Sequence, residues 1–312
     1  MRAVLITNPH ATTSAGWSRE VIVRTLASHF DLTVSSTEHR FHAAEIARQA
    51  RRDGIDIVIT LGGDGTVNET INGLLADGVA GDIPLLGTIP GGLANVFPRS
   101  LGFSADAMLA AGELVQAVEA GSHRRISLGK LNERWFSFNA GVGFDAGIVE
   151  AMEAQRAEGH KASPGRYLLA GIRHYLQDVD TSTPYLTVRA ADGRTIRDVF
   201  MAIVQNTTPY SYVGPLPLDF STGASFTKGL DVVALLDLSP TSIATYLAEA
   251  TAGIPTEKRS KLGYLEDCAS VSITSEIPIP VQVDGDHIGD MTQIEISTAQ
   301  DILTVVCPVS DS

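Results

Sequence analysis

The chain has 312 residues and a mass of 33.1 kDa, with 44% hydrophobic and 19% charged residues. These values exclude a disordered or collagen-like chain and allow a substantial buried core. The formal net charge of −13 disfavours a nucleic-acid-binding surface, which carries an excess of basic residues.

Other features of the sequence indicate the cellular compartment and the expected contact with membranes. No apolar run approaches the roughly 18 residues of a membrane-spanning helix. The opening residues, Met1 to Pro9, indicate a strand and a turn, and we expect a cytoplasmic protein. Cys268 and Cys307 show no metal-binding or disulfide spacing. The acidic charge disfavours firm adhesion to an anionic bilayer, whereas transient contact with a membrane surface remains compatible with it.

The first part of the chain, up to about residue 125, alternates short apolar runs with amphipathic stretches. The expected elements are strands at 4–7, 32–35, 55–60 and 84–88, alternating with helices at 19–30, 43–52, 66–76 and about 104–120. This alternation is typical of a doubly wound parallel sheet, so the predicted fold class is α/β.

From Arg124 onward, strand patterns dominate. Expected strands lie at 124–131, 134–141, 184–190, 195–206, 230–237, 271–275, 279–283, 292–297 and 302–307, with helices near 145–157, 164–178 and 240–252. Asp192-Gly193 is a hairpin turn dipeptide between two of these strands. We predict two domains, 1–129 and 130–312, the second a β-sandwich, with a cleft between them.

A glycine-rich turn follows the expected strand at 55–60. Residues 62–69 read Gly-Gly-Asp-Gly-Thr-Val-Asn-Glu and open a helix. Glycines allow close backbone approach, and a helix N-terminus attracts phosphate. The structural alternative is a tight turn in which Asp64 caps the helix. The first lysine of the chain is Lys130, so phosphates here require backbone amides, hydroxyls, arginine or a metal.

A second glycine turn follows the next strand, at residues 89–97, and Asn8-Pro9 follows the first strand. The carboxyl ends of parallel strands meet at one edge of a sheet, where ligands bind in open α/β folds. We therefore expect these three loops to converge.

These motifs together resemble the diacylglycerol kinase catalytic-domain family, which includes sphingosine kinases and bacterial lipid kinases. The resemblance extends over nearly the whole chain, through 138–146, 229–233 and 283–286. It implies an ATP-binding α/β domain, a β-rich lipid-substrate domain and a dependence on ATP and Mg²⁺. The nucleotide contacts that it implies are Asn8, Pro9, His10, Ala11, Thr12, Thr37, Gly62, Gly63, Asp64, Gly65, Thr66, Val67, Asn68, Gly92 and Asn95.

The chain departs from the family pattern at several positions. Ala11 and Thr12 replace the usual Ser-Gly of the first motif, and Leu93 and Val96 replace Thr and Asp of the second turn. Lys228 stands where an acid is usual, which leaves the metal ligands unassigned. Asp286 stands where the family has a glutamate.

Three acids are the catalytic candidates. Asp64 lies in the phosphate loop and is expected to handle Mg²⁺-ATP. Asp284 and Asp286 flank Gly285, in a sequence that also predicts a simple hairpin turn. The resemblance implies a proton acceptor in this turn, and we keep both acids as candidates.

The remaining polar candidates have weaker support. Asp145 is predicted either to face the lipid head group or to cap a helix. His39 and His42 are interpreted as surface residues, since no acidic or cysteine partner was found in a metal-binding spacing. The expected function is an ATP-dependent kinase acting on a lipid hydroxyl, with diacylglycerol as the acceptor. The alternatives are an NAD kinase-like phosphotransferase and a non-catalytic lipid- or nucleotide-binding protein.

Overall fold

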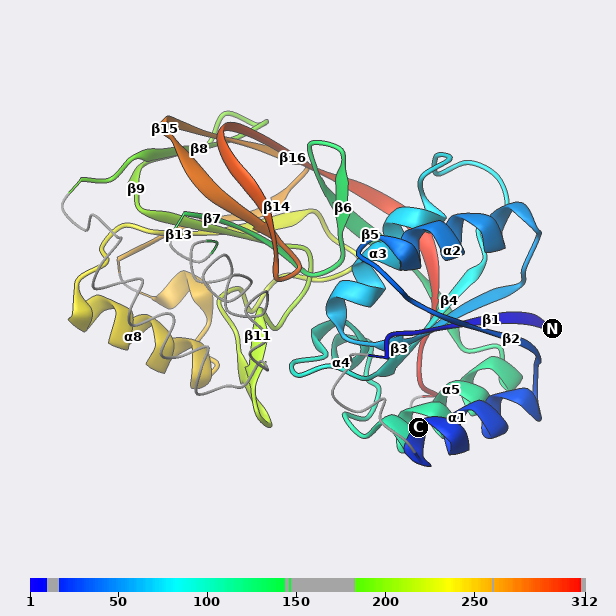
Figure 1. Cartoon of the computed structure of the whole chain (residues 1–312). Coiled ribbons are helices and arrows are strands. Elements are labelled where there is room, and N and C mark those ends of the chain that lie inside the picture. Colours follow the sequence, from blue (N-terminus) through cyan, green and yellow to red (C-terminus); the bar gives the residue numbers. More distant parts are fainter. Residues whose placement is uncertain (10–16, 144–145, 147–182, 260, 310–312) are drawn as a thin grey trace. The chain divides into compact units, whose positions relative to one another are not determined.

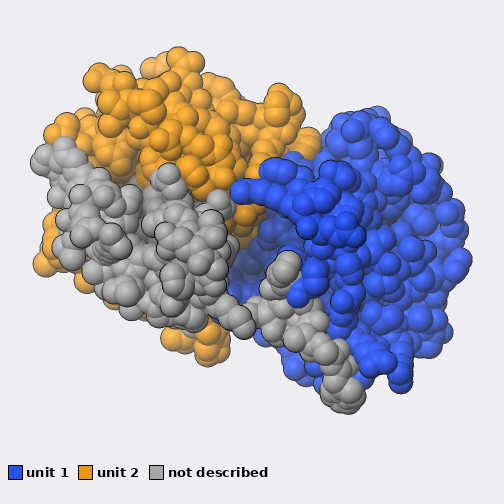
Figure 2. Space-filling view, in the orientation of Figure 1, with its two compact units in different colours: residues 1–126, 301–312 blue, residues 127–300 orange. Residues whose placement is uncertain are grey.

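The computed structural model describes residues 1–9, 17–143, 146, 183–259 and 261–309. The chain divides into two compact units, residues 1–126 with 301–312 (unit 1) and residues 127–300 (unit 2), which Figure 2 shows in blue and orange. The sequence division placed everything after residue 129 in the second domain. The segment from Asp301 belongs to unit 1 instead, because Val305 pairs with Leu86 there.

Unit 1 contains a parallel sheet in the strand order β2-β1-β3-β4-β16. The strands are β1 (Arg2–Thr7), β2 (Asp31–Ser36), β3 (Ile57–Gly62), β4 (Leu85–Pro90) and the end of β16 (Asp286–Val306). Since β2 and β3 lie on opposite sides of β1, the strand order reverses between β1 and β3. This is the switch point at which open α/β sheets bind ligands.

Helices cover both faces of this sheet. Figure 1 shows α2 (His42–Arg52) and α3 (Asp64–Leu74) on one face, and α1 (Trp17–Ala27) and α5 (Ala107–Glu119) on the other. The buried residues of β3 form a continuous apolar run, as expected for a strand covered on both sides. The predicted doubly wound α/β fold is therefore confirmed.

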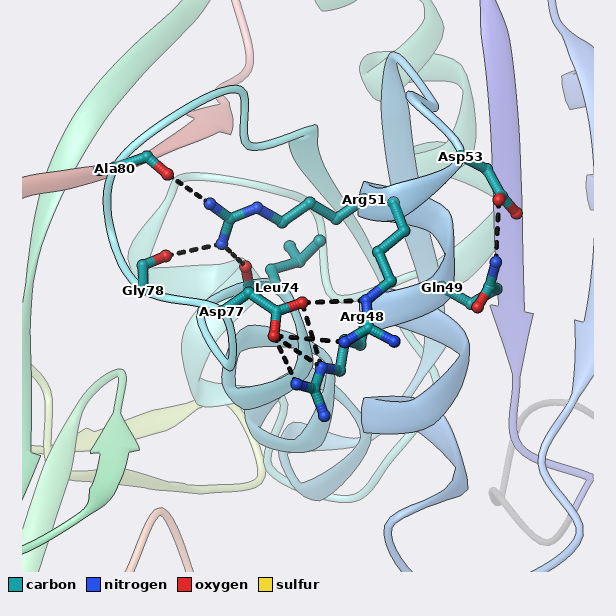
Figure 3. A network of polar contacts seen from close by, with 9 residues as sticks. Arg48, Gln49, Arg51, Asp53, Leu74, Asp77, Gly78 and Ala80 are labelled. Atoms are coloured by element: carbon teal, nitrogen blue, oxygen red, sulfur yellow. Dashed lines mark hydrogen bonds and ion pairs between the residues drawn. The ribbon is translucent and has the colours of Figure 1, made fainter.

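The α2–α3 pair is held by arginines, which Figure 3 shows at close range. Arg51 donates hydrogen bonds to the carbonyl oxygens of Leu74 (2.5 Å), Gly78 (2.6 Å) and Ala80 (2.6 Å). Arg48 and Arg52 both pair with Asp77. These contacts fix the loop after α3 onto α2, at a distance in sequence from the glycine turns.

Unit 2 is built mainly of strands. They are the later part of β5 (His123–Leu131), β6 (Arg134–Phe136), β7 (Asn139–Gly143), β8 (Leu186–Ala190), β9 (Thr195–Val199), β10 (Met201–Gln205), β11 (Ser211–Val213), β12 (Leu216–Leu218), β13 (Leu230–Leu235), β14 (Leu262–Cys268), β15 (Ser270–Val283) and β16 up to residue 300. Alternate residues of β10 enter two cores: Ala202 and Val204 pack in one, and Ile203 packs in the other, beneath α8 (Pro240–Thr251). This alternation agrees with the predicted β-sandwich.

Local predictions in unit 2 can be compared directly. The Asp192-Gly193 hairpin joins β8 to β9, as expected. The helix predicted at 240–252 is α8, whereas those predicted near 145–157 and 164–178 lie outside the described residues. Over the described ranges, no helix combines the length and the apolar character needed to cross a membrane.

Candidate active site

The first glycine turn lies directly at the end of β3. Gly62 ends the strand and Asp64 begins α3, so only Gly63 separates the two elements. Gly63 occupies the N-cap position in an extended conformation and supplies no capping side chain. The helix therefore starts two residues earlier than predicted, and its first turn lies at the carboxyl edge of the sheet.

The second glycine turn packs against the first, backbone to backbone. The Gly91 N–H donates to the Gly62 carbonyl oxygen at 2.8 Å. A Cβ atom on Gly92 would lie 2.6 Å from the Gly63 Cα, closer than real Cβ atoms approach. The glycines of the two turns are thus required by their mutual contact, in addition to any ligand that they bind.

Asn95 closes the second turn with its side chain. Its Oδ1 accepts the Gly92 N–H at 2.7 Å, and its Nδ2 donates to the Gly92 carbonyl oxygen at 2.9 Å. Its backbone is left-handed, with φ of 50°, a conformation that asparagine tolerates better than most residues. Leu93, at the tip of the same turn, is exposed.

Asp64 connects the two turns. Its carboxylate accepts the backbone N–H groups of Val96 and Phe97, each at 3.0 Å, at the start of the short helix α4 (Val96–Ser100). The capping that we considered for Asp64 therefore exists, but it serves α4 and not the helix that Asp64 itself begins. Val96 is buried, so the side chain at the position of the usual Asp lies in the core.

The ends of β1 and β2 lie at the same edge. The Asn8 N–H donates to the Leu61 carbonyl oxygen at 3.2 Å, and the Thr37 N–H donates to that of Thr7 at 2.8 Å. These bonds place Asn8 at the switch point between β1 and β3, with Pro9 following, and place Thr37 on the other side of β1. His10, Ala11 and Thr12 lie outside the described residues.

The other predicted nucleotide residues lie along the first turn of α3. Gly65 and Thr66 follow Asp64, and the Thr66 hydroxyl lies in the space that a Cβ on Gly62 would fill. Val67 and Asn68 are buried, and the Asn68 side-chain oxygen accepts a hydrogen bond from Asn72. The side chains of Val67 and Asn68 therefore lie in the interior of unit 1.

Arg19 is a residue that the sequence analysis missed. Its Nη2 atom lies 3.0 Å from the Thr7 hydroxyl and 2.8 Å from the Ser36 hydroxyl, at the carboxyl ends of β1 and β2. Within the described part of the chain it has no carboxylate partner. The absence of lysine before Lys130 was the signal that should have directed attention to arginines near this edge.

The acidic turn of unit 2 joins β15 to β16. Asp284 and Gly285 both have positive φ, of 48° and 81°, and Val283 pairs with Asp286 across the turn. This is the geometry of a type I′ hairpin, for which Asp-Gly is a preferred dipeptide. The hairpin predicted from the dipeptide is present, and it sets the two acids in different environments.

Asp284 is a buried anchor. Its carboxylate accepts hydrogen bonds from the Ser137 N–H (2.7 Å), the Ser137 hydroxyl (2.9 Å), the Phe138 N–H (3.0 Å) and the Asn139 N–H (3.1 Å). The residue is 4% exposed. With both oxygens occupied by these donors, Asp284 holds the turn against the segment between β6 and β7.

Asp286 is more accessible. Its Oδ2 lies 2.6 Å from Nη2 of Arg134 on β6, and the two side chains are 22% and 18% exposed. The other oxygen, Oδ1, accepts no hydrogen bond within the described residues. Arg134 therefore fixes the position of a carboxylate that retains one oxygen for a further partner. Asp145, the predicted head-group contact, lies outside the described residues.

A histidine cluster corrects one interpretation from the sequence. Ligand atoms of His39, His42 and Glu45 lie within 4.8 Å of one another, so Glu45 is the acidic neighbour that we had not identified. The His42 Nδ1 accepts the Glu38 N–H at 3.0 Å, which places the proton of the neutral ring on Nε2. The two rings also stack, with planes 10° apart, so their lone pairs do not converge on one ion.

Comparison with known proteins finds a family model that matches part of the chain. Residues 2–131 match the family model of the diacylglycerol kinase catalytic domain. This segment of the chain is similar to that catalytic domain. It contains both glycine turns, Asn8, Arg19 and Thr37.

Two relatives show how far the similarity extends. A diacylglycerol kinase of Staphylococcus carnosus (strain TM300) is 25% identical, over 91% of this chain and 90% of the relative. A diacylglycerol kinase of Staphylococcus saprophyticus is 32% identical, but the match spans only 38% of this chain and 36% of the relative. The match at 32% identity thus covers little more than a third of either protein.

Two solved structures share the fold. A diacylglycerol kinase from Bacillus anthracis str. Sterne has a TM-score of 0.72 at 22% identity, covering 98% of this chain and 96% of the other. An NAD kinase from Archaeoglobus fulgidus, solved with ATP, has a TM-score of 0.55 at 13% identity, with coverage of 99% and 94%. At these identities the likeness concerns the fold.

Proposed function

We propose that the protein is an ATP- and Mg²⁺-dependent lipid kinase that transfers the γ-phosphoryl group of ATP to the hydroxyl of diacylglycerol. The observation that carries the proposal is a coincidence of position. The segment that matches the diacylglycerol kinase catalytic domain also carries two interlocked glycine turns at the switch point of a parallel sheet.

Unit 1 supplies the nucleotide site in this proposal. The backbone N–H groups at the start of α3 and of the neighbouring turn bind the phosphates, aided by the positive end of the helix dipole. Arg19 adds the positive charge that a lysine supplies in many other kinases. Asn8, Pro9 and Thr37 form the wall of the site along the ends of β1 and β2.

The residues of unit 1 suit a magnesium ion carried by the nucleotide. Mg²⁺ prefers oxygen ligands, and it is commonly held by one or two carboxylates together with substrate phosphates. Asp64 is the carboxylate that joins the two glycine turns, through the hydrogen bonds that it accepts from the Val96 and Phe97 N–H groups. When bound, the ion neutralises phosphate charge, and Asp64 is the residue that would hold it.

Unit 2 supplies the proton acceptor in this proposal. As the lipid hydroxyl oxygen attacks the γ-phosphorus and ADP leaves, the hydroxyl proton passes to Oδ1 of Asp286. Arg134 holds the carboxylate in place through Oδ2. Asp284 does not take the proton, because its oxygens are occupied by buried donors from Ser137 to Asn139.

The test is transfer of labelled phosphate from ATP to diacylglycerol, a sphingoid base, ceramide and phosphatidylglycerol in mixed micelles, with NAD as a parallel acceptor. We expect labelled diacylglycerol from the wild type, and no label from Asp286→Asn. Label on NAD would replace the proposal with an NAD kinase-like activity. ATP binding without transfer to any acceptor would identify a non-catalytic relative.

A further inference from the structure

The β11–β12 hairpin is a two-stranded sheet of its own, separate from the large sheet. It pairs Ser211 with Leu218 and Val213 with Leu216 around a turn at Gly214 and Pro215. Leu216 is 59% exposed, and Gly214, Pro215 and Pro217 beside it are exposed as well. The hairpin thus presents an apolar end to the solvent.

This part of unit 2 carries no charge. Residues 199–218 contain no Asp, Glu, Lys or Arg. Unit 2 as a whole has 13 Lys and Arg against 21 Asp and Glu, a net charge of −8. An uncharged apolar end on an acidic unit selects partners by apolar contact and not by charge.

Helix α8 adjoins the hairpin. It contacts β12, and the Asp219 N–H donates to the Ala250 carbonyl oxygen at 3.2 Å. Leu218 packs against the core cluster that contains Tyr246 and Ala250, and Leu216, two residues earlier, lies on the same face of the hairpin. Figure 1 shows α8 and the hairpin on the same side of the unit 2 strands.

Two further exposed apolar residues lie along α8 and its end, Leu247 and Ile254. Glu249 is the single charged residue between 240 and 254. We call Pro215, Leu216, Pro217, Leu247 and Ile254 the apolar face. Three of the thirteen large hydrophobic residues that are exposed over the described ranges belong to it.

We propose that the apolar face docks onto a lipid bilayer through its apolar residues, without attraction to anionic lipid. The inference rests on the proposed function, because a diacylglycerol acceptor resides in a membrane. Unit 2 is acidic, so anionic lipid repels it while a neutral surface does not. Tyr212 lies opposite Pro217 in the hairpin, and tyrosine is a residue that favours the membrane–water interface.

The hairpin is poorly suited to the main alternative, the addition of a strand from another protein. Pro215 and Pro217 have no N–H group, so β12 cannot donate a regular ladder of hydrogen bonds along its edge. Insertion of a leucine into lipid needs no such ladder. The hairpin therefore favours a fluid apolar partner over a paired strand.

The test is flotation of the full chain with phosphatidylcholine vesicles that contain diacylglycerol, compared with phosphatidylglycerol vesicles. We expect binding to the first, little dependence on salt, and a loss of about tenfold or more in Leu216→Asp. Ile277→Asp is the matched control, since Ile277 is 55% exposed on unit 2 and lies outside the apolar face. It should bind within about twofold of the wild type.

A second readout separates docking from catalysis. A short-chain diacylglycerol, kept as monomers in solution, should be phosphorylated equally by the wild type and by Leu216→Asp. If the kinase proposal fails, neither acceptor is labelled while vesicle binding still depends on Leu216. The docking inference is overturned if the wild type does not float, if Leu216→Asp floats as well as the wild type, or if phosphatidylglycerol vesicles bind more strongly. It is also overturned if light scattering shows a dimer that Leu216→Asp dissociates.

Discussion

Units 1 and 2 form their candidate sites by different means. In unit 1 the important groups belong to the backbone: two glycine turns touch, and Gly91 is hydrogen-bonded to Gly62. In unit 2 they are side chains, because a buried carboxylate positions a more exposed one two residues later. A backbone site is visible in a short motif, whereas the division of labour between two acids depends on partners far away in the sequence.

The largest expected effect separates the two acids of unit 2. Asp286→Asn removes the proposed proton acceptor, so kcat for lipid phosphorylation should fall by about 100-fold or more. The free energy of unfolding should change by less than about 1 kcal/mol, because the pair with Arg134 is partly exposed. Steady-state kinetics and urea unfolding measure both, with Asp290→Asn on the same strand as control.

Asp284→Ala should show the opposite pattern. The substitution leaves three backbone N–H groups and the Ser137 hydroxyl without their acceptor, and these donors are buried. Each such group costs about 1–3 kcal/mol, so we expect a loss of at least about 3 kcal/mol in the free energy of unfolding. If Asp284→Ala unfolds like the wild type but loses activity, the assignment of anchor and base is reversed.

Gly92→Ala tests the contact between the two turns of unit 1. The added methyl would lie 2.6 Å from the Gly63 Cα, and the turns cannot separate without breaking the bond from Gly91 to Gly62. We expect a loss of about 1–3 kcal/mol in stability, and an increase of about tenfold in the Kd for ATP. The control is Gly112→Ala in α5, where a methyl meets open space and should stabilise the helix.

Arg19→Gln tests whether this guanidinium substitutes for a lysine. We expect KM for ATP to rise about tenfold, with little change in the melting temperature, because a charged hydrogen bond to phosphate is lost. Arg24→Gln on the same helix, where Arg24 pairs with exposed Glu20, should leave KM unchanged. Equal KM values for the two variants would remove Arg19 from the nucleotide site.

The smallest effect concerns an ion-pair network remote in sequence from the glycine turns. Hydrogen bonds from Arg48 and Arg52 hold the pKa of the Asp77 carboxyl well below its usual range. A depressed pKa contributes stability above the unfolded value of about 3.9, and this contribution disappears as the pH falls toward the folded value. The melting temperature of Asp77→Asn should therefore fall below that of the wild type at pH 7, and the difference should close in acid. Asp82→Asn, at an exposed loop position, should show no such trend.

Prediction from sequence worked best where periodicity and turn chemistry act locally. The helix predicted at 43–52 is α2, and the strand at 32–35 is the core of β2. Four shorter strands were predicted where β15 and β16 run for 14 and 21 residues. β15 continues through Pro278 and Pro280, with a register shift between Thr274 and Ile279.

By itself, the sequence determined the α/β and β-rich parts of the chain, the two glycine-rich turns and the acidic hairpin. Each of these features depends on residues that are close together in the sequence. The spacing of apolar residues predicts the elements, the spacing of glycines predicts the turns, and the Asp-Gly dipeptide predicts the hairpin. Tertiary structure alone decided that Asp64 caps α4, that Asp284 is the anchor, and that Arg19 reaches the ends of β1 and β2. These roles depend on hydrogen-bond partners between 12 and 147 residues away, and pairing over such distances is settled by the folding of the whole unit.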